Sequence, residues 1–221
     1  MKNIYTKGEV VDYVWQYSRH YGELLQYCDI IVNEISGHAG LINLFNLTEV
    51  ILKDSIKKYD IEFYKVLREL KEKKYITNIE YNFLNNKKIS VRKFRNVFAH
   101  SNLSRYNLIF NDEPNILYPL TENSTCIKLY NIYSDIIYNI ILKVIAREFI
   151  IDINVKLDDL IKEIDIKIRE MTPEELLKLK GIDFRENSEW NKLSKDDRYR
   201  LADNSGDVSI YAGILKQLLK E

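Results

Sequence analysis

The chain has 221 residues, of which 46% are hydrophobic, and its 33 Lys and Arg residues balance 33 Asp and Glu residues. This length and composition allow a sizeable core and indicate one globular domain with an appendage, or two small domains. The formal net charge is zero, so the chain as a whole lacks the excess of positive charge that is typical of proteins which bind nucleic acids. Between Lys53 and Arg95, however, 13 basic residues stand against 6 acidic residues, so the local charge is positive.

Cysteine usage and hydropathy bear on the compartment in which the protein works. Cys28 lies in an apolar helical stripe, so we expect a reduced, buried thiol rather than a disulfide or a metal ligand. The most apolar stretch, 136–151, is interrupted by Lys143, Arg147 and Glu148, and we expect no membrane span. The N-terminus lacks an apolar signal core. These features predict a cytoplasmic protein.

Helical periodicity dominates the first hundred residues. Apolar residues recur at three- and four-residue steps over 9–35, which predicts one long helix that the glycines of 37–40 then break. Further helices are predicted over 41–58, over 60–74 with Asp60 as N-cap, over 77–86 and over 89–101. Such neighbouring helices pack most economically as a long antiparallel bundle.

The pattern changes after residue 101. Apolar runs at 106–110 and 116–120 flank turn residues, and they predict a short two-stranded excursion. A strongly apolar helix over 125–150 is then expected to complete the core. The sequence thus predicts an all-α antiparallel bundle over 1–150.

Residues 151–221 are predicted to form a helical extension that covers the bundle or binds a partner. Its helices are expected over 156–171, from Thr172 and Pro173 to Gly181, from Ser194 onward, and over the amphipathic segment 207–220. No repeat or low-complexity tract interrupts either part of the chain.

The helix expected over 89–101 combines an apolar face with polar chemistry. Four side chains share the apolar face at about 100° per residue: Val91, Phe94, Val97 and Phe98. Arg95, Asn96 and His100 lie off that face, with Arg92 one turn before Asn96. Because Arg95 and His100 are off the packed face, we expect Arg95→Ala or His100→Ala to change stability by at most about 1 kcal/mol.

The order Arg95, Asn96 and then His100 resembles the signature of the HEPN superfamily, whose Arg, following polar residue and His form the active site of metal-independent ribonucleases. The segments 63–76 and 80–85 resemble the helices that precede this motif in many prokaryotic members. The resemblance covers roughly residues 9 to 150 and implies a HEPN-like bundle without a cofactor. It also implies a homodimer in which two Arg/His sets share one cleft.

The motif residues supply the chemistry that metal-independent RNA cleavage needs. Histidine titrates near neutrality, so His100 is the candidate acid or base. Arg95 can give paired N–H bonds to phosphate oxygens as charge grows in the transition state, and Asn96 can orient His100 or contact the substrate. Attack by the 2′-hydroxyl would leave a 2′,3′-cyclic phosphate and a 5′-hydroxyl, and DNA should resist cleavage.

Other residues near the motif are candidates for RNA contact, although for the charged ones a role in surface solubility is equally expected. These candidates are Arg92, Lys93, Ser101, Asn102 and Arg105. No metal site is predicted, since His20 and His38 lie far in sequence from any second cluster of ligands.

Two functions therefore remain open from the sequence. The leading prediction is a dimeric endoribonuclease that acts as a toxin or antiviral-defence effector, with RNA as substrate and an antitoxin or defence-system protein as partner. The alternative is a catalytically silent HEPN-like interaction or regulatory module, in which Arg95 and His100 serve the structure. Toxicity that vanishes with His100→Ala would separate the two.

Overall fold

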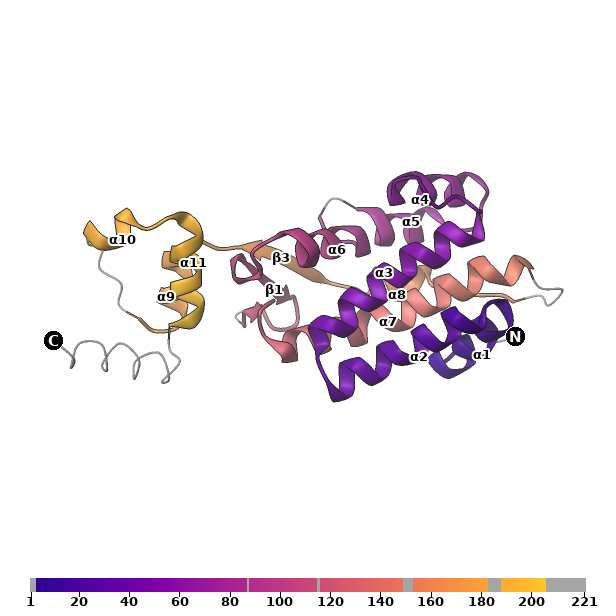
Figure 1. Cartoon of the computed structure of the whole chain (residues 1–221), viewed down its shortest axis with the longest axis horizontal. Coiled ribbons are helices and arrows are strands. Elements are labelled where there is room, and N and C mark those ends of the chain that lie inside the picture. The colour runs from indigo at the N-terminus through magenta and orange to yellow at the C-terminus, as the bar shows by residue number, and fades with distance from the viewer. Residues whose placement is uncertain (1–2, 87, 115, 149–152, 183–187, 206–221) are drawn as a thin grey trace.

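The computed structural model describes residues 3–86, 88–114, 116–148, 153–182 and 188–205. Eleven α-helices and one three-stranded sheet make up this described part. Most helices form an elongated bundle, and a small group of C-terminal helices lies beyond one end of it (Figure 1). The prediction of a mainly helical bundle is confirmed, with a larger sheet than expected. None of the helices in the described ranges combines the length and hydropathy needed to span a lipid bilayer.

The first predicted helix is two helices, α1 (Lys7–Tyr17) and α2 (Arg19–Glu34). Ser18 between them has extended backbone angles (φ −155°, ψ 113°), and its side chain accepts a hydrogen bond from the Tyr21 amide. A serine can thus cap a new helix without interrupting the apolar stripe, which is why the prediction of one helix over 9–35 is wrong. α1 packs against α2 at Gly22, where a Cβ would lie 2.1 Å from the Trp15 ring.

Helix α3 (Gly37–Ser55) begins where the sequence predicted a break. Ser36 caps it by accepting a hydrogen bond from the Ala39 amide. Gly40 sits inside the helix because α2 crosses it closely, and a Cβ there would lie 1.9 Å from a Val32 methyl group. The glycines of 37–40 therefore permit close helix packing instead of ending a helix.

Three shorter helices follow: α4 (Phe63–Glu72), α5 (Asn78–Asn85) and α6 (Val91–His100). Their existence confirms the prediction, and Thr77 and Ser90 cap α5 and α6 through their side chains. Asp60 is not the N-cap of α4. That position belongs to Glu62, which makes no side-chain capping bond.

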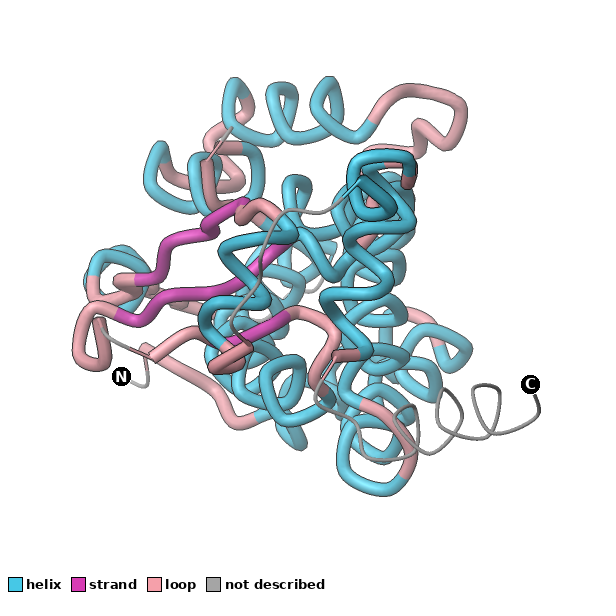
Figure 2. Tube along the Cα trace, turned by 90° about the vertical axis from the view of Figure 1, so that its left-hand side faces the viewer, coloured by secondary structure: helices cyan, strands magenta, loops and turns pink. Residues whose placement is uncertain are grey.

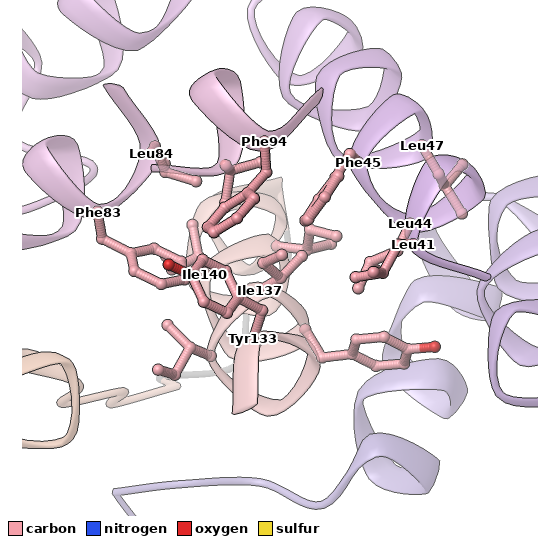
Figure 3. Close-up of a cluster of buried hydrophobic side chains, with 14 of the residues drawn as sticks. Leu41, Leu44, Phe45, Leu47, Phe83, Leu84, Phe94, Tyr133, Ile137 and Ile140 are labelled. Atoms are coloured by element: carbon pink, nitrogen blue, oxygen red, sulfur yellow. The ribbon is translucent and has the colours of Figure 1, made fainter. Parts of the chain in front are cut away.

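Helix α7 (Asn123–Ile145) runs through the middle of the bundle and ends in a 3₁₀ turn over Ala146–Glu148. Its inward side chains meet α3, α5 and α6 in a cluster of buried aromatic and aliphatic groups (Figure 3). Tyr133 is central to this cluster: its ring lies 5.0 Å from Phe83 and 5.4 Å from Phe94 between centroids. The predicted core helix over 125–150 is confirmed, although it starts earlier and ends earlier.

The excursion after α6 is part of a three-stranded antiparallel sheet. After a 3₁₀ turn (Leu103–Arg105), β1 (Tyr106–Phe110) pairs with β2 (Tyr118–Pro119), as predicted. β1 also pairs with β3 (Ile166–Glu170), with Leu108 opposite Ile168. The three strands run side by side among the helices (Figure 2).

The predicted helix over 156–171 is therefore wrong beyond its first turns, because only α8 (Asp158–Lys162) is helical. The segment carries two periods at once. Leu160 and Ile164 keep helical spacing, while Ile164, Ile166 and Ile168 alternate as in a strand. The segment forms a strand because it can pair with the open edge of β1. β3 therefore belongs to the sheet of the bundle, although it lies beyond the predicted boundary at residue 150.

The C-terminal helices are α9 (Pro173–Leu179), α10 (Ser188–Lys192) and α11 (Lys195–Asn204). They enclose a second small core whose members are Met171, Leu176, Leu177, Trp190, Tyr199 and Ala202. Thr172 and Pro173 start α9, and Ser194 caps α11, as predicted. Gly181 follows α9 with a positive φ of 73°. The predicted segment 207–220 lies outside the described residues.

Candidate functional site

The two faces of α6 are those that the sequence predicts. All four apolar side chains of the predicted face are buried: Val91, Phe94, Val97 and Phe98. Phe94 has no exposed surface, and its ring stacks on Phe45 of α3 at 6.4 Å between centroids. The packed face thus fixes the direction in which the polar residues of α6 point.

Asn96 and His100 are exposed on the opposite face, one helical turn apart. Within the described part of the chain, neither side chain makes a hydrogen bond or an ion pair. His100 is the last residue of α6, and Ser101 caps the helix through its backbone. An exposed imidazole with an amide one turn before it is open to a ligand from solvent.

Arg95 is less free than the sequence suggests. Its Nη1 lies 2.5 Å from Oε2 of Glu49, and its Nε donates a hydrogen bond of 3.1 Å to Oδ1 of Asn46. Both partners belong to α3, and the Arg95 side chain keeps 32% of its surface exposed. The guanidinium is therefore held in place by the neighbouring helix, with its outer edge still accessible.

Glu49 connects Arg95 to a second cation. Its other carboxylate oxygen lies 2.8 Å from Nζ of Lys53, and only 12% of the Glu49 side chain is exposed. A pocket of about 340 Å³ opens beside this group and is lined by Asn46, Glu49, Val50, Lys53, Tyr59 and Arg95. The carboxylate partly offsets the positive charge of Arg95 and orients it.

Asn46 and Glu49 were missed in the sequence. One signal was present, because Glu49 is the only acidic residue between positions 37 and 53 of an otherwise apolar helix. A lone carboxylate that is mostly buried needs a cationic partner, and Lys53 and Arg95 both fill that role here. No pattern in the sequence indicated that a partner would come from α6.

Arg92 and Lys93 lie near aromatic rings on both sides of α6. The Arg92 guanidinium is 5.7 Å from the centroid of Tyr64, and Lys93 Nζ is 5.9 Å from the centroid of Tyr106. Both side chains are half-buried. Both side chains are partly accessible, and their contacts with RNA remain a prediction.

Asn102 and Arg105 have clear structural contacts. The Asn102 side chain caps the 3₁₀ turn after α6 by accepting from the Ser104 amide at 3.2 Å. Arg105 pairs with Glu170 of β3, and its guanidinium lies 5.2 Å from the Tyr199 ring. These residues tie α6, the sheet and the C-terminal helices together, and their role in RNA binding stays a prediction.

His38 contacts neighbouring groups of the bundle. Its Nε2 lies 2.7 Å from the carbonyl oxygen of Leu120, and its ring packs edge-on against Phe98 at 6.1 Å. Among the described residues, no group of three or more His, Cys, Asp or Glu side chains is placed to hold a metal ion. Both cysteines, Cys28 and Cys126, are free and buried.

Helix α6 thus presents an exposed imidazole and amide. The guanidinium of Arg95, about 140° from His100 around the helix, is oriented toward α3. Groups of these kinds can bind a phosphate and transfer a proton. Comparisons with protein-family models, with curated proteins and with solved structures found no match.

Proposed function

We propose that the protein is a metal-independent endoribonuclease. The observation that carries this proposal is the exposure of Asn96 and His100, one turn apart and without partners among the described residues, on the same helix as the oriented guanidinium of Arg95. The imidazole of His100 is thus accessible to a substrate from solvent. RNA is the substrate, and the site needs no cofactor.

The chemistry follows from the groups present. The 2′-hydroxyl oxygen attacks the adjacent phosphorus, the bond from phosphorus to the 5′-oxygen breaks, and a 2′,3′-cyclic phosphate and a 5′-hydroxyl remain. One His100 accepts the proton of the 2′-hydroxyl, and the protonated His100 of a second copy donates a proton to the leaving oxygen. Arg95 stabilises the extra negative charge on the phosphate.

The contacts of Arg95 with α3 are compatible with this role. A guanidinium has five N–H donors, and Glu49 and Asn46 engage Nη1 and Nε. The donors of Nη2 remain for a phosphate oxygen. Glu49 and Asn46 then act as positioning residues that fix Arg95 before RNA binds, which lowers the cost of ordering it.

A homodimer is part of the proposal, since a single Arg95 and His100 offer too few groups to neutralise phosphate and move both protons. Exposed apolar side chains beside the site support it. Ile42 and Val50 of α3 are 40% and 44% exposed, and Ala99 of α6 is exposed as well. Covering these groups with a second copy would bring the two α6 helices together and form a composite site.

The biological role belongs to the same proposal. A cytoplasmic enzyme of this kind would act as a toxin or antiviral-defence effector, restrained or triggered by an antitoxin or another defence-system protein. Arg92, Lys93, Ser101, Asn102 and Arg105 are the further residues that we propose contact the RNA backbone. Among these, Arg92 and Lys93 lie on α6 itself.

A second candidate function is a catalytically silent helical interaction or regulatory module. It is favoured by the contacts of Arg95, because an arginine that pairs with a mostly buried glutamate is accounted for by stability alone. It leaves the exposure of Asn96 and His100 unexplained. We therefore place it second.

Purified wild type, His100→Ala and His20→Ala proteins separate the two functions. His20 is an exposed histidine of α2 outside the site, which makes it a matched control. We expect wild type and His20→Ala to cleave a mixed RNA in the presence of EDTA, and His100→Ala to be at least about a hundredfold slower. No cleavage by the folded wild type would favour the silent module. Equal cleavage by all three proteins would overturn the assignment of His100 as a catalytic residue.

A further inference from the structure

A second surface of the bundle has the form of a binding pocket. It has a volume of about 620 Å³ and lies between α7, the end of β1, and the connection from α8 to β3. This pocket shares no residue with the candidate site on α6. Its volume lies in the range in which pockets of proteins bind ligands or side chains of partners.

The walls of the pocket are apolar. Phe110, Ile136 and Ile166 are buried, and Ile132 and Leu160 are partly buried against the same core. These residues belong to β1, β3, α7 and α8, so the pocket lies between α7, α8 and the two strands. An aliphatic chain that enters it would exchange contact with water for contact with these apolar side chains.

The rim of the pocket is acidic. Four exposed carboxylates line it, namely those of Asp112, Asp135, Glu163 and Asp165. No Lys, Arg or His lines the pocket, and in the described ranges none of these carboxylates forms an ion pair. Asp165 accepts a hydrogen bond from Asn111. By contrast, the acids Glu49, Glu69, Glu80 and Glu113 all pair with lysines elsewhere in the bundle.

We propose that this pocket docks a basic segment of a partner protein by taking up one of its arginine or lysine side chains. Such side chains combine an aliphatic stem with a cationic head, which matches apolar walls below a ring of carboxylates. The four negative charges disfavour RNA, so this surface is distinct from the proposed catalytic one. The proposal does not depend on ribonuclease activity.

The position of the carboxylates favours a protein over a small cation. They lie on exposed residues of α7, of the loop after β1 and of the loop before β3, around the mouth of the pocket. A metal ion would need converging ligands, and no such group of three is present among the described residues. A side chain presented from a neighbouring surface reaches both the walls and the rim at once.

Binding of a synthetic peptide to the whole protein tests the proposal. The probe is the amidated peptide Ser-Ile-Arg-Ile-Arg-Ile-Ser with a fluorophore on its N-terminal amine, and its binding is followed by fluorescence anisotropy. In the control peptide both arginines are replaced by glutamate. The pocket variant is Asp135→Asn with Glu163→Gln. The control variant is Asp12→Asn with Glu72→Gln, which changes the net charge equally at exposed residues outside the pocket. Circular dichroism checks that all are folded.

We expect saturable binding of the arginine peptide to the wild type and no binding of the glutamate peptide. The pocket variant should bind the arginine peptide at least about fivefold more weakly, whereas the control variant should bind it as the wild type does. Spermidine, an aliphatic polyamine, serves as a competitor and should displace the peptide only weakly. Equal losses in both variants would reduce the effect to net charge and overturn the proposal, as would absence of binding at millimolar peptide. Full displacement by micromolar spermidine would assign the pocket to small polyamines instead. Should the pocket variant not fold, Asp112→Asn with Glu163→Gln replaces it.

Discussion

The guanidinium of Arg95 on α6 lies 2.5 Å from the carboxylate of Glu49 on α3, and this pair joins the candidate site to the core of the bundle. Glu49 is mostly buried, whereas Arg95 keeps about a third of its side chain in solvent. The pair therefore contributes to stability and at the same time fixes a candidate catalytic group. Sequence alone placed Arg95 on a free surface, and the structure revises that expectation.

A double-mutant cycle measures what this pair contributes. We expect the coupling free energy between Arg95→Met and Glu49→Gln, from urea unfolding, to be about 1 kcal/mol or more, because Glu49 is mostly shielded from water. The matched control is the exposed pair Arg19 and Glu23, for which about 0.3–0.5 kcal/mol is expected. Equal coupling in both cycles would show that the contact adds nothing beyond a surface ion pair.

Among the described ion pairs of the bundle, we expect the pair of Lys143 and Glu80 to lower the free energy of unfolding most when one partner is removed. The Glu80 side chain has no exposed surface, and both of its oxygens accept hydrogen bonds from Lys143 at 2.8 and 2.9 Å. Lys143→Met leaves that carboxylate buried without its cation and should lower the free energy of unfolding by about 3–5 kcal/mol. Lys162→Met, which removes the exposed pair with Asp159, should change it little. A similar, small effect of both substitutions would contradict the burial of Glu80.

The backbone at Lys74 offers a stabilising substitution. Lys74 follows α4 with a φ of 59°, a left-handed conformation that glycine adopts more easily than lysine. Lys74→Gly should raise the free energy of unfolding by about 0.5–1 kcal/mol, since relief of strain exceeds the added entropy of the unfolded chain. Lys73→Gly, at a φ of −73°, should give no gain. A loss of stability with Lys74→Gly would speak against the left-handed turn.

The two thiols should be inert in the folded protein. Burial raises the pKa of both Cys28 and Cys126 to about 12, so almost no thiolate exists at pH 8. We expect negligible reaction with a disulfide reagent in native buffer and two reactive thiols per chain in urea. Rapid native labelling of either cysteine would contradict its burial.

The same thiols should make the free energy of unfolding fall as the pH rises above about 8.5. In the unfolded chain a cysteine ionises near pH 8.5, whereas the folded pKa of each is about 12. Their contribution to stability is therefore fully present below about pH 8.5 and is lost as the pH rises toward 12. Replacing both by alanine should flatten the decline in the free energy of unfolding between pH 8.5 and 10.5, and an unchanged slope would count against this assignment.

Much of the fold could be predicted from periodicity, because the buried stripes of α3, α6 and α7 repeat at helical spacing. Two features could not. Ser18 ends one helix and caps the next within a continuous apolar stripe. Residues 164–168 satisfy both helical and strand periods, and only the presence of β1 beside them selects the strand.

The candidate site was predictable only in part. The faces of α6 follow from the spacing of Phe94, Phe98 and His100, which a single helix determines. The contacts of Arg95 with Asn46 and Glu49 depend on how α3 lies against α6, and sequence spacing carries no information about that packing. The acid-rimmed pocket is likewise assembled from four separate elements.

Whether His100 and the 2′-hydroxyl act together can be measured with an RNA oligonucleotide in EDTA and with the same oligonucleotide carrying a single 2′-deoxyribose at the position cut. We predict that the wild type leaves a 2′,3′-cyclic phosphate and a 5′-hydroxyl on the RNA and does not cut at the deoxyribose. We also predict that folded His100→Ala cuts neither oligonucleotide. Cleavage of the deoxy-substituted strand at the same rate, or unchanged cleavage by His100→Ala, would contradict a ribonuclease that works through His100 and the 2′-hydroxyl.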